Sequence, residues 1–363
     1  MTNHNNHSRK KKVAILIEHG FEDIEFTIPC NGLKQAGMEI VVLGSRMNEK
    51  YKGKRGKVSV QPDATTTEAI AAEFDAVVIP GGMAPDKMRR NPNTVSFVQK
   101  AMEQGKWVAA VCHGPQLLIE GDLLKGRKAT GFTAIRKDMI NAGVNYLDEP
   151  LVVDRNLITS REPGDLGIFT TALLSRLGYG GKDAALPEEK DTSAQWWKLA
   201  DAWGGSTKGE ITRGLNIALS GERYSMEALE QYTQKESDHE VRSLFQEMIS
   251  NRQRHIQKLE TYLNTLHEKP SIVANIANQY AKVKSTFTGS DDIYQLRCAL
   301  GDVQTGLGDI SNLSAMYTDP VATAIFKEIY QDLLKYEQRL AQLYRRGIGT
   351  EIQPPKPTTG VAL

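Results

Sequence analysis

The chain has 363 residues, which is longer than one ordinary domain, so we expect two domains. Its content of 40% hydrophobic and 25% charged residues is typical of a globular protein in water. A formal net charge of +1 argues against nucleic acid or an anionic membrane surface as a partner, and no apolar run approaches the roughly 20 residues of a membrane span.

The three cysteines, Cys30, Cys112 and Cys298, are odd in number and far apart in the sequence. We therefore expect no disulfide framework and a reducing, cytoplasmic location. The first residues are polar and basic without the apolar core of a secretory signal, so residues 1–11 are expected to be a disordered lead-in.

Residues 12–180 alternate continuous apolar runs with helical stretches. The apolar runs are Val13–Ile17, Ile40–Leu43, Ala76–Ile79 and Trp107–Val111. Continuous rather than alternating apolar residues indicate strands that are buried on both faces, as in a parallel sheet covered by helices. We therefore predict a doubly wound α/β domain with a mostly parallel sheet.

The rest of the chain has a different pattern. Residues 181–208 mix glycine, proline and charge, and we expect a linker whose tryptophans dock it onto one of the domains. Apolar residues at helical spacing then predict two long helical hairpins joined by a long crossover, which is an all-α four-helix bundle of the ferritin-like kind over residues 209–346. The proline-rich tail, residues 347–363, is expected to be disordered.

The run Trp107–Val111 leads directly into Cys112-His113-Gly114-Pro115. A cysteine between a buried strand and a helix lies on a sharp elbow, where its side chain is offered to solvent as a nucleophile. The nearby helix N-terminus favours thiolate, so Cys112 is expected to be the only cysteine with a depressed pKa. Cys30 and Cys298 lie within apolar helical stripes and are expected in the core.

The elbow at Cys112 is one of several motifs, namely Phe21–Glu25, Ile79–Gly82, Ala84–Asp86, Val111–Pro115, Lys137–Asp138, Asn141–Gly143 and Thr159–Arg161. Together they resemble the PfpI branch of the ThiJ/PfpI superfamily, over about 165 residues. The resemblance implies a sheet of the flavodoxin-like, class I amidotransferase-like type.

The resemblance implies that Cys112 is the nucleophile and His113 its partner. It also implies a homo-oligomer in which an acidic residue of a neighbouring subunit completes the site, and Asp86 stands where the family usually has Glu. One of Glu22 and Glu25 is expected to hydrogen-bond the sulfur as a protonated acid, because a carboxyl shielded from water has a raised pKa. The superfamily pattern favours Glu25, but the residues themselves leave the choice open.

Glycines near the cysteine are the candidates for binding substrate. Gly81 and Gly82 lack side chains, so their amides can approach an oxyanion together with the amide of His113. Gly114, in the elbow itself, completes the expected substrate-binding set.

The implied activity is attack by Cys112 on an activated carbonyl. We expect small reactive carbonyl compounds such as 2-oxoaldehydes, or their early adducts on proteins, as substrates, with no cofactor. One alternative is a PfpI-type intracellular cysteine peptidase acting on peptides. Another is a non-enzymatic redox sensor or chaperone in which Cys112 is oxidised. Class I amidotransferases need a further histidine, and none occurs between residues 114 and 238.

Metal binding by the helical half is not expected. Di-iron bundles need about four carboxylates and two imidazoles, whereas the sequence offers Glu222 and His255 at suitable places. Arg252 stands three residues before His255, where a carboxylate is needed, and the corresponding residues of the last helix are Leu333 and Tyr336. We expect Arg252 to pair with Glu222. The partner of the bundle cannot be named from the sequence.

Overall fold

The computed structural model describes residues 9–179, 186–191, 193–271 and 292–348. The chain divides into two compact units, residues 1–206 and residues 207–363, and each is described here by itself. Among the described residues, no helix has both the length and the apolar character that crossing a membrane requires.

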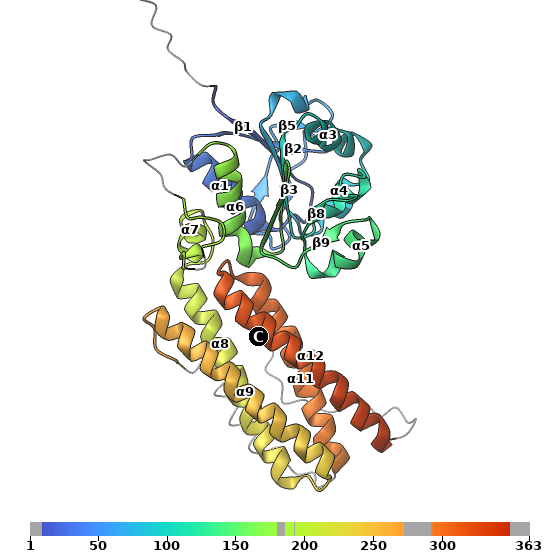
Figure 1. Cartoon of the computed structure of the whole chain (residues 1–363), viewed down its shortest axis with the longest axis vertical. Coiled ribbons are helices and arrows are strands. Elements are labelled where there is room, and N and C mark those ends of the chain that lie inside the picture. The colour runs from blue at the N-terminus through green and yellow to red at the C-terminus, as the bar shows by residue number, and fades with distance from the viewer. Residues whose placement is uncertain (1–8, 180–185, 192, 272–291, 349–363) are drawn as a thin grey trace, which may run out of the picture. The chain divides into compact units, whose positions relative to one another are not determined.

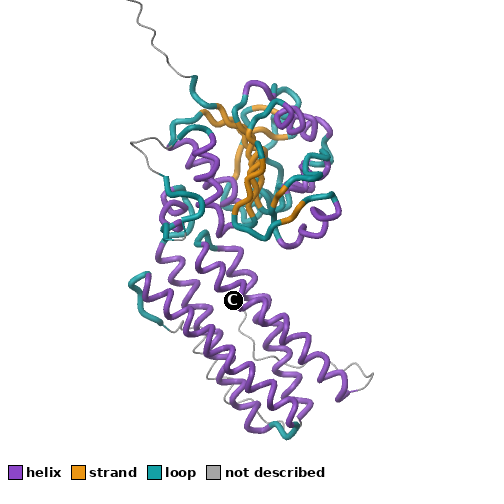
Figure 2. Tube along the Cα trace, viewed as in Figure 1, coloured by secondary structure: helices purple, strands orange, loops and turns teal. Residues whose placement is uncertain are grey.

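A seven-stranded sheet forms the centre of the first unit (Figures 1 and 2). Its strands are β1 (Lys12–Leu16), β2 (Glu39–Gly44), β5 (Ala64–Thr65), β6 (Ala76–Ile79), β7 (Trp107–Val111), β10 (Leu151–Asp154) and β11 (Leu157–Ser160). The order is β10-β11-β7-β6-β1-β2-β5, and only the edge strand β10 is antiparallel to its neighbour. The predicted doubly wound, mostly parallel sheet is confirmed.

Helices cover both faces of this sheet, with α1 and α6 on one side and α3 and α4 on the other (Figure 1). The helices of the first unit are α1 (Asp23–Gln35), α2 (Ala84–Met88), α3 (Pro92–Glu103), α4 (Pro115–Glu120), α5 (Arg136–Asn141), α6 (Leu166–Arg176) and α7 (Trp196–Ala202). Two small sheets are formed by β3 (Tyr51–Lys52) with β4 (Ser59–Val60) and by β8 (Lys128–Ala129) with β9 (Asn145–Tyr146).

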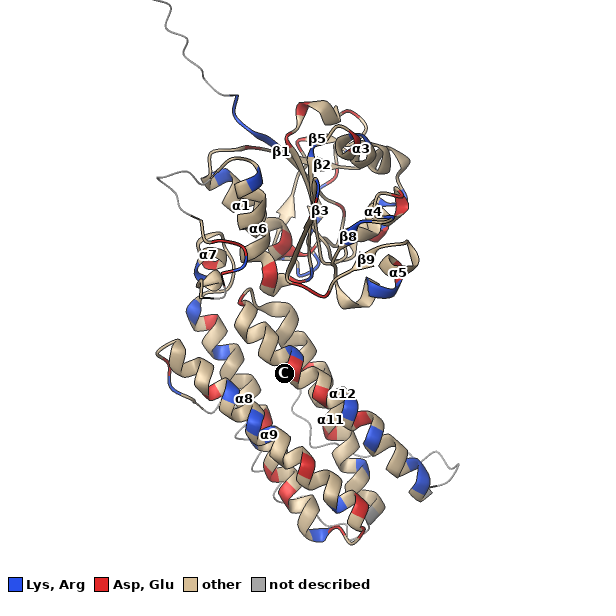
Figure 3. Ribbon diagram, in the orientation of Figure 1, with Lys and Arg blue, Asp and Glu red and all other residues tan. Residues whose placement is uncertain are grey.

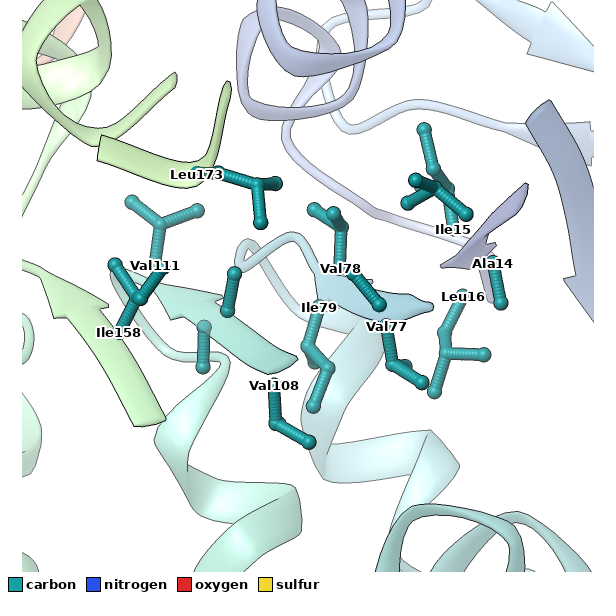
Figure 4. Packing of buried hydrophobic residues seen from close by; sticks show 14 of the residues in the cluster. Ala14, Ile15, Leu16, Val77, Val78, Ile79, Val108, Val111, Ile158 and Leu173 are labelled. Carbon is teal, nitrogen blue, oxygen red and sulfur yellow. The ribbon is translucent and has the colours of Figure 1, made fainter. Parts of the chain in front are cut away.

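The continuous apolar runs are buried because the sheet is sandwiched between helices. All four residues of β6 are buried, and so are four of the five in β7. Figure 4 shows side chains of β1, β6, β7 and β11 packed together, with Leu173 of α6 beside them. In the register of the sheet, Ile79 lies opposite Ala110, so the ends of β6 and β7 bring Gly81 close to Cys112.

The expected linker, residues 181–208, needs correction, because part of it is helix α7 packed onto the first unit. Trp196 and Trp203 are buried there. Asn31 and Gln35 of α1 donate hydrogen bonds to the carbonyls of Trp203 and Ala202, at 2.9 and 3.0 Å. The docking of tryptophans onto a domain was expected, whereas the helix was not, because only seven residues form it.

The chain ends also differ in part from the expectation. Arg9 and Lys11 form ion pairs with Asp75, at 3.1 and 3.3 Å, so these two residues of the expected lead-in are placed against the first unit. Residues 1–8 lie outside the described residues. The last helix continues to Ile348, and residues 349–363 of the expected tail also lie outside them.

Four long helices form the described part of the second unit: α8 (Lys208–Lys235), α9 (His239–Thr265), α11 (Asp292–Met316) and α12 (Pro320–Ile348). α8 and α12 each pack against both α9 and α11, which is the arrangement of a four-helix bundle. The side chain of Thr207 accepts a hydrogen bond from the backbone amide of Glu210, and the Glu210 carboxylate accepts one from the backbone amide of Thr207. This capping box fixes the start of α8. Acidic and basic residues are interspersed along these helices (Figure 3). The long crossover expected between the hairpins falls largely outside the described residues.

Candidate active site

Cys112 occupies a tight turn between β7 and α4. The strand ends at Val111, the helix begins at Pro115, and Cys112 has a φ of 60°. Such a left-handed conformation costs a residue other than glycine about 1–3 kcal/mol, and such residues cluster at functional sites. A Cβ atom at Gly114 would lie 2.5 Å from the carbonyl oxygen of Ile79, so only glycine fits the next turn of the elbow.

Gly81 is the point at which three parts of the site meet. A Cβ atom there would lie 2.7 Å from both Glu25 Oε2 and the amide nitrogen of His113, and 2.8 Å from Cys112 Cβ. The absence of a side chain at Gly81 therefore allows the acid, the nucleophile and the amide to approach one another.

The amides of the expected substrate-binding glycines have different roles in the structure. The amide of Gly81 donates to Glu25 Oε2 at 2.7 Å, and that of Gly114 donates to the carbonyl of Val111 at 2.8 Å. Neither is therefore free for a substrate. The amides of Gly82 and His113 instead face the Cys112 sulfur and act to lower the pKa of its thiol. They are the two donors placed to stabilise an oxyanion formed beside the sulfur.

Glu25 lies in the first turn of α1 and is fully buried. Burial raises its pKa to about 8, and the nearby negative charge of Glu22 adds to this shift. Its second oxygen, Oε1, has no hydrogen-bond partner among the described residues. A carboxyl group that keeps its proton at neutral pH can donate a hydrogen bond, which an ionised one cannot.

Glu22 has a different environment from Glu25. One of its oxygens accepts from Arg55 Nε at 2.5 Å, and the other lies 3.7 Å from Lys54 Nζ. Of the two candidate acids, Glu25 is the one beside Cys112, and Glu22 holds the loop that carries Lys54 and Arg55. That basic loop was not singled out in the sequence, although the run Lys52–Lys57 could have drawn attention to it.

The environment of Cys112 differs from the expected exposed thiolate. Only 7% of the residue is accessible, because Glu25, the Gly81–Gly82 turn and His113 surround it. Burial raises the pKa of the Cys112 thiol well above its ordinary value, and the Glu25 carboxyl adds to this. The expected depressed pKa is therefore not what the structure gives. Helix α4 has only six residues, so its dipole offsets little of the burial. Cys30 and Cys298 are buried, as predicted.

His113 lies directly beside the nucleophile, with Nδ1 at 3.2 Å from Cys112 Sγ. Burial lowers the pKa of His113, and the positive charge of Lys54 lowers it further. Its ring also contacts the Phe132 ring, with 5.0 Å between centroids, which limits its orientation. A neutral imidazole at this distance can take the proton of the thiol.

Asp86 is not brought to Cys112 within one chain. It lies on α2, its side chain is 59% exposed, and it pairs with Arg89 at 2.5 Å. A role in the site of a neighbouring subunit remains a prediction.

The buried polar residues of the second unit form a connected cluster. Arg252 Nη1 donates to Glu222 Oε1 at 2.7 Å, which confirms the predicted ion pair. The two ring nitrogens of His255 contact Glu222 Oε2 at 2.9 Å and Asp332 Oδ2 at 3.1 Å. In the last helix, the sequence analysis placed the position of a metal ligand at Leu333. The acid that contacts His255 is Asp332, one residue earlier.

This cluster does not fit the pair of metal ions that ferritin-like bundles often hold. His255, Glu328 and Asp332 offer ligand atoms within 4.8 Å of one another. Their carboxylates are already neutralised: Glu328 contacts Lys258 at 2.5 Å, and Asp332 contacts Arg254 at 2.9 Å. A guanidinium and surrounding ammonium groups thus stand where metal ions would need free carboxylates.

Comparison with known proteins follows the division into two units. A model of the DJ-1/PfpI family matches residues 11–176. The putative cysteine protease YraA of Bacillus subtilis is 43% identical over 167 residues, which span 46% of this chain and 98% of that protein. The chain belongs to the DJ-1/PfpI family. Protein/nucleic acid deglycase 2 of Escherichia coli is also 43% identical, over 169 residues that span 46% of this chain and 98% of its own.

A solved structure matches both units of this DJ-1/PfpI chain. It is a two-domain protein from Anabaena variabilis with DJ-1/ThiJ/PfpI-like and ferritin-like domains. It is 78% identical, covers 97% of this chain and 100% of its own, and has a TM-score of 0.92. The predicted combination of a PfpI-type domain with a ferritin-like bundle is thereby confirmed.

Proposed function

We propose that the first unit is a cysteine-dependent enzyme acting on small reactive carbonyl compounds of the 2-oxoaldehyde class, or on their early adducts with proteins. The observation that carries this proposal is the enclosed pair of Cys112 Sγ and His113 Nδ1, 3.2 Å apart at a residue that is only 7% accessible. A sulfur with so little room around it suits a small aldehyde better than a folded polypeptide.

The residues support a balanced reaction for a 2-oxoaldehyde. The thiol of Cys112 gives its proton to His113 as the sulfur attacks the aldehyde carbon, and the amides of Gly82 and His113 face the new oxyanion. His113 returns this proton to the oxyanion, which gives a hemithioacetal. The neutral imidazole then takes the proton of the former aldehyde carbon and delivers it to the ketone carbon, while the hydroxyl proton passes to the ketone oxygen. The product is a thioester of the 2-hydroxy acid, an isomer of the hemithioacetal. Water hydrolyses this thioester, releases the acid and restores the thiol. One aldehyde and one water give one 2-hydroxy acid.

The names of the relatives support two kinds of activity. The Escherichia coli relative is named as a protein/nucleic acid deglycase, and the Bacillus subtilis relative as a putative cysteine protease. We favour carbonyl chemistry, because deglycation also begins at a small carbonyl-derived group. Peptide hydrolysis is the second candidate, and the name of the Bacillus protein is the observation that favours it.

The test is to incubate the full chain with methylglyoxal and to follow the lactate produced. We expect turnover in the natural protein, none in Cys112→Ser, and normal turnover in Cys30→Ala, which removes a buried thiol outside the site. A fluorescent casein substrate is assayed in parallel. Casein cleavage that depends on Cys112, without lactate, would favour the peptidase. The absence of both activities, together with oxidation of Cys112 by peroxide, would favour a redox sensor.

A further inference from the structure

A small cavity, open on one side, lies between helices of the bundle in the part of the second unit that the structure describes. Its volume is about 80 Å³. Aliphatic side chains from α8, α11 and α12 form the apolar part of its wall, namely Ile217, Ile310, Leu313, Ile329 and Leu333. Glu222 and Arg252 form one of its polar portions. The cavity is thus largely apolar, with a few polar groups, which is the usual composition of a site for a small organic molecule.

One hydrogen-bond donor at this cavity is left unused. Arg252 is 3% exposed and lines the cavity, and its Nε has no hydrogen-bond partner among the described residues. Its Nη1 is committed to Glu222, whose other oxygen is committed to His255. A buried N–H of a guanidinium without an acceptor costs free energy, which a ligand with an acceptor oxygen would recover.

The charges around the cavity select a neutral ligand. The positive charge of Arg252 is already balanced by Glu222. Asp302 and Asp309 also line the cavity, so an anion would meet carboxylates there. An ammonium cation carries N–H donors and no acceptor, so it would leave the Nε–H of Arg252 unpaired. A neutral molecule with one acceptor avoids both costs.

We propose that this cavity is a binding site for a small neutral carbonyl compound, whose oxygen accepts from Arg252 Nε and whose alkyl groups contact the aliphatic wall. The volume limits the ligand to about three to five non-hydrogen atoms, since a cavity of roughly 150 Å³ is known to hold benzene. The site is separate from Cys112, and it does not depend on the reaction proposed for the first unit.

Gly221 of α8 offers a way to fill the cavity without removing a polar group. It lines the cavity, and a Cβ atom there would meet no atom within 4 Å. Gly308 of α11 is a matched control: it also lies within a helix with open space at its Cβ position, but it is not among the cavity-lining residues. Both glycines should gain stability on replacement by alanine, because alanine favours the helix.

The experiment measures binding of acetone and of isobutene to the full chain by ligand-observed NMR. Isobutene has the size and shape of acetone but no acceptor oxygen. We expect acetone to bind about tenfold more tightly than isobutene, since the hydrogen bond is made to a charged group. Gly221→Leu should abolish binding of both, whereas Gly308→Leu should leave both unchanged. Cys112→Ser should bind acetone as the natural chain does, which excludes attack by the thiol as the source of the signal.

The role of Arg252 is tested by Arg252→Lys, which keeps the positive charge but loses Nε. Acetone affinity should fall about tenfold, and isobutene affinity should change by less than twofold. Should this variant fail to fold, the comparison of Gly221→Leu with Gly308→Leu still decides whether the ligand occupies the cavity. Equal affinity for the two ligands, or acetone binding that survives Gly221→Leu, would overturn the proposal, as would no detectable binding of either ligand.

Discussion

Burial and the adjacent Glu25 carboxyl together raise the pKa of the Cys112 thiol, while Glu25 itself has a pKa raised to about 8. The two groups therefore titrate as a pair rather than as independent sites. Below about pH 8 the carboxyl is protonated and can stabilise a forming thiolate. Above that pH the negative charge of the ionised Glu25 opposes formation of the Cys112 thiolate. Reactivity at this site consequently depends on keeping a proton on the acid.

We expect a bell-shaped pH profile of kcat/KM. The acid limb should lie below about 6.5, because burial and Lys54 lower the pKa of His113, which must be neutral to accept the thiol proton. The alkaline limb should lie near pH 8, where Glu25 loses its proton. Glu25→Gln should remove that limb. Glu22→Gln should retain it at a lower pH, since the charge of Glu22 raises the pKa of Glu25. An alkaline limb unchanged in Glu25→Gln would show that another group is responsible.

The same shift predicts how stability depends on pH. The unfolded chain ionises Glu25 above about pH 4.5, whereas the folded chain holds the proton up to about pH 8. Between these values the unfolded state binds fewer protons, so Glu25 lowers stability as the pH rises. Glu25→Gln should thus stabilise the first unit by about 2–4 kcal/mol at pH 7.5 and by almost nothing at pH 4.

Calorimetry at several pH values checks this prediction, and Glu22→Gln is the control. Glu22 forms ion pairs with Arg55 and Lys54, so its neutralisation should destabilise the protein at neutral pH. Two variants that each replace one buried carboxyl group should therefore shift the Tm in opposite directions. A lower Tm for Glu25→Gln at pH 7.5 would contradict the raised pKa.

The bundle should retain little iron, manganese or zinc. Its carboxylates are occupied: Glu222 by Arg252, Glu328 by Lys258, and Asp332 by Arg254. After the full chain is loaded with ferrous iron and desalted, elemental analysis should give far less than two irons per chain. The fold should survive a chelator with an unchanged Tm. Two irons per chain would restore an oxidase interpretation of this half.

We propose that Asp86 acts across a subunit boundary, because it is exposed on α2 and the family resemblance places an acid there. Cys112→Ser and Asp86→Asn should each be inactive when pure. When the two variants are unfolded together and refolded, mixed oligomers should contain some intact sites and recover up to about a quarter of the activity. Sedimentation should show an oligomer. A fully active monomer would rule out the shared site.

The sequence was most informative where one short segment determines the structure. Ala76–Ile79 and Trp107–Val111 were predicted as buried strands with the bounds that β6 and β7 have, because continuous apolar runs are enough to indicate them. The elbow at Cys112 could also be predicted, because the apolar run ends directly before this residue. The hairpin of β10 and β11 was not predicted as strands, since its residues were considered only for their resemblance to family motifs.

The electrostatics of the site could not be predicted, because they depend on contacts between distant segments. Glu22 and Glu25 are equivalent in the sequence, and the loop with Arg55 is what distinguishes them in space. The burial that raises the pKa of Cys112 likewise arises from residues some 30 and 90 positions away, at Gly81 and Glu25. Reasoning from neighbouring residues identified only the helix N-terminus, whose effect on the pKa of Cys112 is weaker than that of burial.

Cys112 has a left-handed backbone, with a φ of 60°, so the residue that the reaction needs also lowers the stability of the fold. Glycine adopts this conformation without steric cost, whereas the cysteine incurs it in every folded molecule. Among inactive replacements, Cys112→Gly should therefore be the most tolerant of heat, ahead of alanine and serine. Selection for thermal tolerance alone would remove the nucleophile, so only a requirement for its chemistry can keep a cysteine at this turn.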